Sequence, residues 1–473
     1  MSRVAWFTPL PPVSSGVARY SAELIPELTS HQHIDIFVDG SPVHVERPCP
    51  AAAVFSAHDF VWKHARDPYD LVIYQLGNAR CHDYMWGYLA RYPGLVVLHD
   101  GQFHHARALS LREQRREDDY REEFRLNHPD VPPDAAELAI AGWLGSLMYL
   151  WPMRRLVVES ARGVLVHNRW LADEIRDEHP DTSVHVVDMG VADGYSAGDR
   201  RSIRARHSIP DEAVLFVILG MATPEKRIKQ AIRALAAITP TAPGSHLMLV
   251  GPAVDHYDPI ADARAYGIAD RVTVVGAVPH EDLAGYLSMA DVCLCLRWPT
   301  SRETSAAWLR CLAAGRATVV TDLVHMTDIP TLDPRSWKLA HAPAPLERET
   351  LDTPRAEPVA VSIDILDEDH SLKLAMERLV TDAKLRAKLG RNARALWEAR
   401  FTLEGMASGY RDAIVATVAS PMPDARKLGL LPRHLRPDGT EKAAELLKAM
   451  RVPESRIEHL WRGQHIWRGQ RRT

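Results

Sequence analysis

The stretch RWPTSRETSAAWLRCLAAGRATVV, residues 297–320, crowds charged and hydroxyl side chains between two apolar runs. The run VCLCL just before it and the run ATVV at its end are predicted to be buried strands. The alanine-rich segment between them has the spacing of a helix that packs closely on a sheet. A strand, a helix and a second strand in this order are the unit of an α/β fold. The charged residues then lie where the first strand ends and the helix begins.

The same alternation of apolar runs and helical patterns extends over most of the 473 residues. Near-continuous apolar strands separated by helices predict parallel sheets that are covered on both faces. The chain is therefore predicted to be α/β, with two doubly wound Rossmann-like domains facing each other across a cleft. The strands are expected to begin near residues 4, 34, 71, 95, 163 and 184 in the first domain, and near 213, 247, 271, 292, 317 and 359 in the second.

A polar stretch with two glycines over 192–208 predicts the domain boundary. The segment 106–155 interrupts the strand–helix rhythm and is predicted to be a helical insertion, which begins with a charged and solvated helix. After 419 the chain carries the repeat WRGQ twice and a basic end. The predicted regions are an N-terminal domain over 1–198, a C-terminal domain over 199–395, a helix over 396–418 and an extension over 419–473.

The composition is that of a globular cytoplasmic protein. A net charge of −4 argues against a broad nucleic-acid-binding surface, so no nucleic-acid partner is expected. The five cysteines are scattered and are expected to be reduced thiols. The apolar stretch 138–153 is shorter than the about 20 residues of a membrane span. It is predicted to be a buried or lid helix, with a peripheral contact at the inner membrane face as the alternative.

Ligands of doubly wound domains bind beyond the carboxyl ends of the strands. After the first strand, Gly16 opens a helix whose N–H groups suit a phosphate, although a plain turn fits the pattern equally well. After the strand near 95, His99 is predicted to make a polar contact with a ligand, with a structural role as the alternative. His104 and His105 follow, but their spacing does not match HExxH, so no metal site is predicted.

The first strand of the second domain ends at Gly220, and Lys226 and Arg227 follow at a predicted helix start. A cation at a helix N-terminus opposes the helix dipole unless an anion lies there. The pair therefore indicates either a phosphate site or a solvated surface pair.

The opening stretch supplies further polar groups to the same cleft. Arg297 ends a strand, and Thr304 and Ser305 can cap the next helix, whose free N–H groups can hold an oxyanion. Glu303 and Arg310 are seven residues apart and share a helix face. The pattern predicts a polar ligand site, with donors for phosphate and a carboxylate for hydroxyl groups.

Several motifs, in this order over residues 4–415, resemble family 4 of the retaining nucleotide-sugar glycosyltransferases, which have the GT-B fold. PLPPVSSGVARYSAEL resembles the glycine loop of that family, VVLHD its strand with a donor-contacting histidine, and LGMATPEKRIKQAI its phosphate loop. RETSAAWLRCLAAGRATVVTD follows in the order of the family, and ARALWEARFTLEGMASGY resembles the helix that crosses back to the N-terminal domain.

The resemblance implies a hexosyltransferase that moves a sugar from a nucleoside-diphosphate donor to a saccharide, polyol or lipid-linked acceptor. It implies no metal and no cofactor, and no pattern in the chain predicts an oligomeric state. Lys226 takes the place of the phosphate lysine, and His99 that of the donor-contacting histidine.

The chain departs from the family pattern at three positions. Met221 stands where the family often has an arginine, and the Glu-x7-Glu motif falls on Arg302 and Arg310. A branch with a Glu-Thr-Ser sequence is more similar, which passes the sugar contact to Glu303, while Arg297 or Arg302 would replace the phosphate arginine. The alternatives are an epimerase or phosphorylase on the same fold, and a non-catalytic sugar-nucleotide-binding or scaffold protein.

Overall fold

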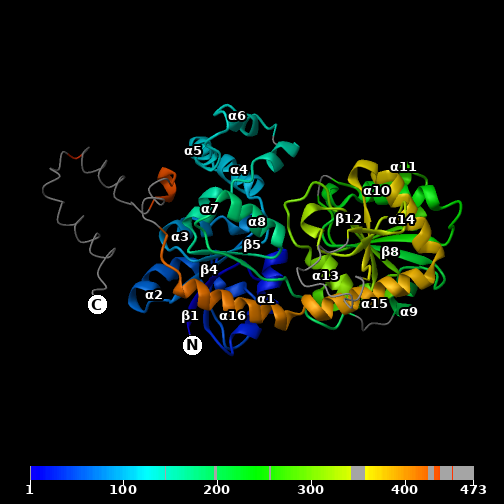
Figure 1. The fold of residues 1–473 in the computed structure, drawn as a ribbon, viewed down its shortest axis with the longest axis horizontal. Coiled ribbons are helices and arrows are strands. Elements are labelled where there is room, and N and C mark those ends of the chain that lie inside the picture. The colour runs from blue at the N-terminus through cyan, green and yellow to red at the C-terminus, as the bar shows by residue number, and fades with distance from the viewer. Residues whose placement is uncertain are drawn as a thin grey trace, which may run out of the picture.

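The computed structural model describes residues 2–143, 145–195, 200–254, 257–341, 357–423, 431–436 and 450. They form two α/β domains that lie side by side, with the helices α4 (His104–Glu113), α5 (Glu117–Asn127) and α6 (Ala135–Ile140) standing out from the first (Figure 1). The predicted fold class is confirmed.

The N-terminal domain is built on a seven-stranded parallel sheet in the order β3-β2-β1-β4-β5-β6-β7. The strands β4, β5 and β6 are buried along their whole length, as their mostly apolar sequences require. The strands are β1 (Arg3–Phe7), β2 (His33–Val38), β3 (Ala53–Ser56), β4 (Leu71–Leu76), β5 (Leu95–Leu98), β6 (Gly163–Val166) and β7 (Val184–Val186).

The C-terminal domain has an eight-stranded sheet in the order β10-β9-β8-β11-β12-β15-β13-β14, in which the pairing of the last two strands is antiparallel. The sequence did not predict β3, β13 and β14, because these strands are short and lie at or next to a sheet edge. The strands are β8 (Val214–Leu219), β9 (Ser245–Val250), β10 (Val272–Gly276), β11 (Val292–Cys295), β12 (Ala317–Thr321), β13 (Thr331–Leu332), β14 (Leu339–His341) and β15 (Ala360–Ile363).

Helices cover both faces of each sheet, and buried apolar side chains fill the space between (Figure 1). The further helices of the first domain are α1 (Gly16–Leu28), α2 (Phe60–Arg66), α3 (Met85–Arg91), α7 (Arg155–Ser160) and α8 (Arg169–Glu178). Those that follow are α9 (Arg200–Arg206), α10 (Ile228–Ile238), α11 (Pro259–Ala265), α12 (Leu283–Met289), α13 (Ala306–Ala313), α14 (Glu368–Thr381), α15 (Ala383–Arg400) and α16 (Leu403–Ala419).

The helical insertion has a small core of its own. The helix α5, expected to be solvated, buries Tyr120 and Phe124 in this core and pairs the fully buried Glu123 with Arg107. The pattern of charges along α5 does not reveal this burial, because Arg107, the partner of Glu123, belongs to a different helix, α4.

The expectation of one buried or lid helix over 138–153 is wrong. The helix α6 ends at Ile140, and Gly142 and Gly145 take positive φ angles of 87° and 29° that break the helical run. Trp143 is 72% exposed. Within the described part of the chain, no helix is both long and apolar enough to cross a membrane.

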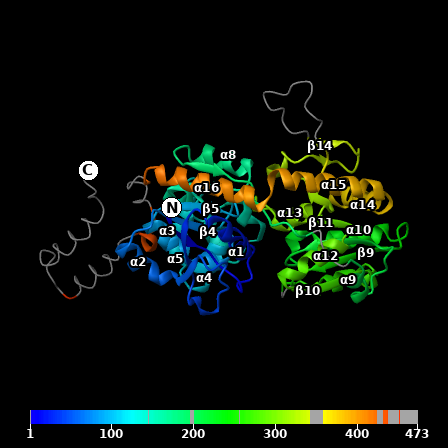
Figure 2. The ribbon, with the colours of Figure 1, turned by 90° about the horizontal axis from the view of Figure 1, so that it is seen from below.

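The chain crosses between the domains near residue 401. The helix α15 lies along the C-terminal domain, and α16 runs back along the N-terminal domain beside α1 (Figure 2). The hydroxyl groups of Tyr20 on α1 and Tyr410 on α16 lie 2.6 Å apart and join these two helices.

The beginning of the extension packs on the N-terminal domain through Leu431 and Leu435. The WRGQ repeats lie outside the described residues. That residues 420–473 are dispensable for donor binding stays a prediction, which donor titration of a truncated protein would test.

Candidate active site

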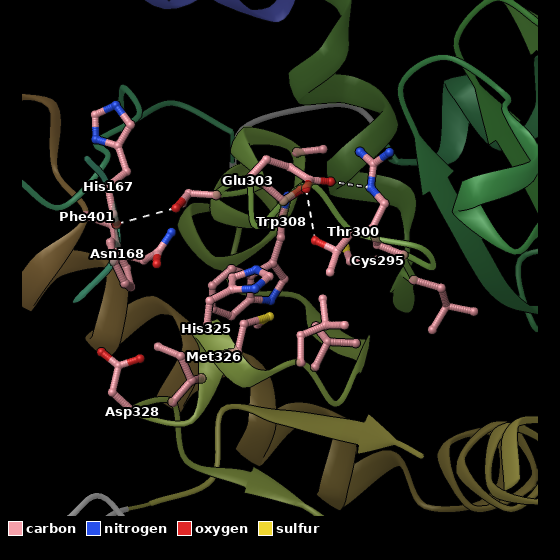
Figure 3. A pocket seen from close by; sticks show the side chains of 18 of the residues that line it. His167, Asn168, Cys295, Thr300, Glu303, Trp308, His325, Met326, Asp328 and Phe401 are labelled. Atoms are coloured by element: carbon pink, nitrogen blue, oxygen red, sulfur yellow. Dashed lines mark hydrogen bonds and ion pairs between the residues drawn. The ribbon is translucent and has the colours of Figure 1, made fainter. Parts of the chain in front are cut away.

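A cavity lies at the carboxyl ends of β8, β11 and β12, and is closed on one side by residues of the N-terminal domain (Figure 3). The N-terminal domain contributes the residues that follow β6 and β7. Five of the predicted site residues line this cavity: Lys226, Arg297, Glu303, Thr304 and Ser305.

Lys226 lies in a tight turn rather than at the start of a long helix, because α10 begins only at Ile228. Its ammonium group donates to the carbonyl oxygen of Leu219. Gly220 has a φ of +89°, and a Cβ atom there would lie 2.7 Å from the lysine nitrogen, so this glycine makes room for the ammonium group. Burial, with the charge of Arg297 next, lowers the pKa of Lys226 to about 8.

Arg297 and Glu303 form an ion pair of 2.7 Å on the cavity wall. The second carboxylate oxygen of Glu303 accepts a hydrogen bond from the Thr300 hydroxyl at 3.0 Å (Figure 3). The same oxygen accepts the Ser301 amide at 2.8 Å. Glu303 thus fixes both the arginine and the loop that precedes α13.

The start of α13 also faces the cavity. Ser305 caps the helix by accepting the amide of Trp308 at 3.2 Å, as the sequence predicts. The Thr304 hydroxyl donates to the carbonyl of His167 at 3.4 Å, so the loop touches the N-terminal domain here. The remaining N–H groups of the first turn have no partner within the helix and suit an anion.

Three predicted arginines do not line the cavity, because each is held by a carboxylate elsewhere. The guanidinium of Arg227 binds both oxygens of Glu368 on α14. Arg302 and Arg310 are paired with glutamates of the N-terminal domain. The phosphate contact of these three residues stays a prediction.

Two predicted residues of the N-terminal domain also lie off the cavity wall. His99 bonds Gln75 at 2.7 Å and packs edge-on against Tyr20. Burial, with the charge of His167 next, holds the pKa of His99 well below its usual range. Gly16 starts α1, where a Cβ atom would meet nothing within 4 Å, so no close approach requires glycine there.

The histidines that follow β5 contact different partners. His104 bonds the Tyr120 hydroxyl at 2.8 Å inside the helical insertion, apart from His99. Among the described residues, no three His, Cys, Asp or Glu side chains are grouped so that they could hold a metal ion.

Sequence reasoning missed several polar residues of the cavity. Arg400, the last residue of α15, lies 3.1 Å from Asp188 and 2.9 Å from Asp328. His325 follows β12, and burial lowers its pKa. Asp188 and His325 follow predicted strands, so the expectation that ligands bind beyond strand ends could have identified them. No feature of the sequence indicates that Arg400, at the end of α15, lies at the cavity.

Asp100, next to His99 at the end of β5, does not line the cavity, but it lies close enough to Glu303 for their charges to interact. Its carboxylate accepts the amide of Asn78 at 2.7 Å. Burial, with the charge of Glu303 next, raises the pKa of Asp100 to about 7.

Known proteins share this architecture and, in part, this sequence. Residues 199–325 match the family described as Glycosyl transferases group 1. Sucrose-phosphate synthase from Thermosynechococcus elongatus is similar over 88% of this chain and 100% of its own, with a TM-score of 0.59 and 17% identity. The fold is GT-B.

Two further relatives extend the comparison. HepE from Anabaena, solved in complex with UDP, is similar over 88% of this chain and 100% of its own, with a TM-score of 0.58 and 13% identity. Alpha-D-kanosaminyltransferase from Streptomyces kanamyceticus is 24% identical over 275 residues, 55% of this chain. The match spans 63% of that relative's length, less than two thirds.

Proposed function

We propose that this protein is a retaining glycosyltransferase that moves a sugar from a nucleoside-diphosphate sugar to a hydroxyl group of a saccharide, polyol or lipid-linked acceptor. One observation carries the proposal: Lys226, Arg297 and the capped start of α13 converge on one cavity at the strand ends of a GT-B fold. The match of residues 199–325 to group 1 glycosyltransferases supports it, since that segment contains all three. Structures of HepE with UDP and UDP-glucose support the donor class.

The difficult event in such a reaction is departure of the nucleoside diphosphate, on which negative charge grows as the glycosidic bond breaks. Lys226, Arg297 and the free N–H groups of α13 would stabilise that charge without a metal ion. Glu303 would accept hydrogen bonds from hydroxyl groups of the sugar, since each carboxylate oxygen can accept more than one bond. No residue is assigned the role of a general base. Retention of configuration rests on the family resemblance.

A thermal-shift screen with UDP, GDP and ADP sugars tests the donor class. One donor at 100 times its Kd should stabilise the protein by about 2.7 kcal/mol. Transfer with that donor, followed by NMR of the product anomer, tests retention. Absence of a shift with every sugar nucleotide would contradict the proposal.

The affinity for the donor is expected to fall as the pH rises from about 7 to 9, because Lys226 has a pKa of about 8 and loses its charge in this range. The unfolded chain keeps the usual lysine pKa of 10.5 and binds more protons, so the free energy of unfolding of the unbound protein rises with pH between about 8 and 10.5 as the cost of burying this charge disappears. Calorimetric titration of the donor against pH checks the first effect. Lys226→Gln should flatten the profile, and a flat profile in the wild-type protein would rule out a titrating lysine contact.

Glu303→Gln is expected to lower turnover and to weaken discrimination between donor epimers. The affinity for the free nucleoside diphosphate should hardly change, because the glutamine oxygen can still accept a hydrogen bond from Arg297, and Lys226 is untouched. Binding of the diphosphate and of the sugar nucleotide, measured side by side, checks this. A parallel loss of both affinities would show that Glu303 acts on the phosphate end instead.

A further inference from the structure

Two arginines of the segment around α13 each reach a glutamate of the N-terminal domain. Arg302 lies before the start of α13 and is 3.1 Å from Glu174 on α8. Arg310 lies within α13 and is 2.9 Å from Glu23 on α1. The two ion pairs therefore flank the part of the segment that faces the cavity.

The Arg310 contact is shielded from water. The side chains of Arg310 and Glu23 are 12% and 13% exposed, and His280 approaches the same carboxylate oxygen at 3.2 Å. The Tyr195 hydroxyl accepts a hydrogen bond from Arg310 at 2.9 Å. Burial raises the pKa of Glu23, but His280 and Arg310 outweigh it and lower the pKa overall. Loss of one partner from such a pair leaves an uncompensated buried charge.

The Arg302 contact belongs to a larger docked loop. The Gly101 amide donates to the Ser301 carbonyl at 2.6 Å, and the Asn168 side chain donates to the Arg302 carbonyl at 3.0 Å. The Arg302 guanidinium lies 4.8 Å from the ring centre of Trp170. The backbone of Arg302 has a φ of 60°, a left-handed conformation that a non-glycine residue keeps only when its surroundings impose it.

We propose that Arg302 and Arg310 form an interdomain clasp, and that both are positioning residues. The clasp holds Glu303 and the start of α13 against His167 and Asn168, so that cavity walls from both domains are assembled for transfer. The proposal rests on the proposed function of the cavity. It predicts a specific kinetic signature. The groups assigned to the diphosphate all belong to the C-terminal domain, so a broken clasp should impair turnover while the donor still binds.

The buried pair offers a double-mutant test in the full-length protein. Arg310→Gln or Glu23→Gln alone should lower single-turnover transfer by about tenfold, within the range of couplings between contacting residues. Donor Kd, measured by calorimetry, should change less than about threefold. The double variant should be faster than either single variant, because no unpaired buried charge remains. Each single variant should also increase the radius of gyration in small-angle X-ray scattering.

Arg204→Gln is a matched control. Arg204 is fully buried and bonds Asp291 at 2.7 Å, but both residues belong to the C-terminal domain. This variant should lose stability, while the turnover of the folded protein and its radius of gyration stay unchanged. Arg302→Gln should likewise lower turnover while the donor Kd stays nearly unchanged.

Three outcomes would overturn the clasp: equal losses of donor affinity and turnover, a double variant whose loss of turnover is the product of the two single losses, or an unchanged radius of gyration in every variant. Failure of the proposed function is distinguishable from these. If the wild-type protein transfers no sugar, scattering and the double-mutant cycle of unfolding free energies still test the clasp, because neither measurement needs a substrate.

Discussion

Lys226→Ala is expected to lower turnover by about 10²–10³-fold, or roughly 3–4 kcal/mol of transition-state stabilisation. The ammonium group lies on the cavity wall at the carboxyl end of β8, where the diphosphate is proposed to leave. A contact that strengthens as charge develops lowers the barrier more than it tightens substrate binding. Donor Kd should therefore change less than turnover.

Single-turnover transfer with the identified donor measures this effect. The melting temperature of the protein without donor should not fall, because burial disfavours the charge of Lys226, as its pKa of about 8 indicates. Lys226→Arg should recover only part of the rate, since a guanidinium is broader than an ammonium group and spreads its charge over a plane. Near-normal transfer by the alanine variant would remove Lys226 from the mechanism.

Gly190→Ala is expected to destabilise the protein by about 3 kcal/mol or more, at the upper end of overpacking costs. A Cβ atom at this position would lie 2.2 Å from the carbonyl oxygen of Thr402, which caps α16. The obstacle is backbone, so relief requires α16 to shift away from the N-terminal domain. Because α16 begins directly after the crossing between the domains, the change should also disturb the interdomain cavity.

Urea denaturation of both proteins measures the loss of unfolding free energy. Gly16→Ala is the matched control, because a Cβ atom there meets nothing within 4 Å and alanine favours the helix that it starts. The control should be at least as stable as the wild-type protein. If Gly190→Ala were equally stable, the close contact with Thr402 would not hold in solution.

Local sequence patterns determined the fold and part of the site. Apolar runs alternating with helical spacing predict parallel strands, and the carboxyl ends of parallel strands meet at one edge of a sheet. That rule placed Lys226 and Arg297 on the same cavity from positions in two different strand–helix units. The cap at Ser305 followed from residues within one turn of the helix. The functional roles of these residues stay predictions.

Only the tertiary structure decided which charges are free for a ligand. Arg227, Arg302 and Arg310 suit a phosphate in the sequence, yet each meets a glutamate from a distant segment. Asp188, Asp328 and Arg400 come together from three separate parts of the chain. Backbone periodicity and capping depend on neighbours in sequence, whereas the partner of a long charged side chain depends on which helix the folded chain places opposite it.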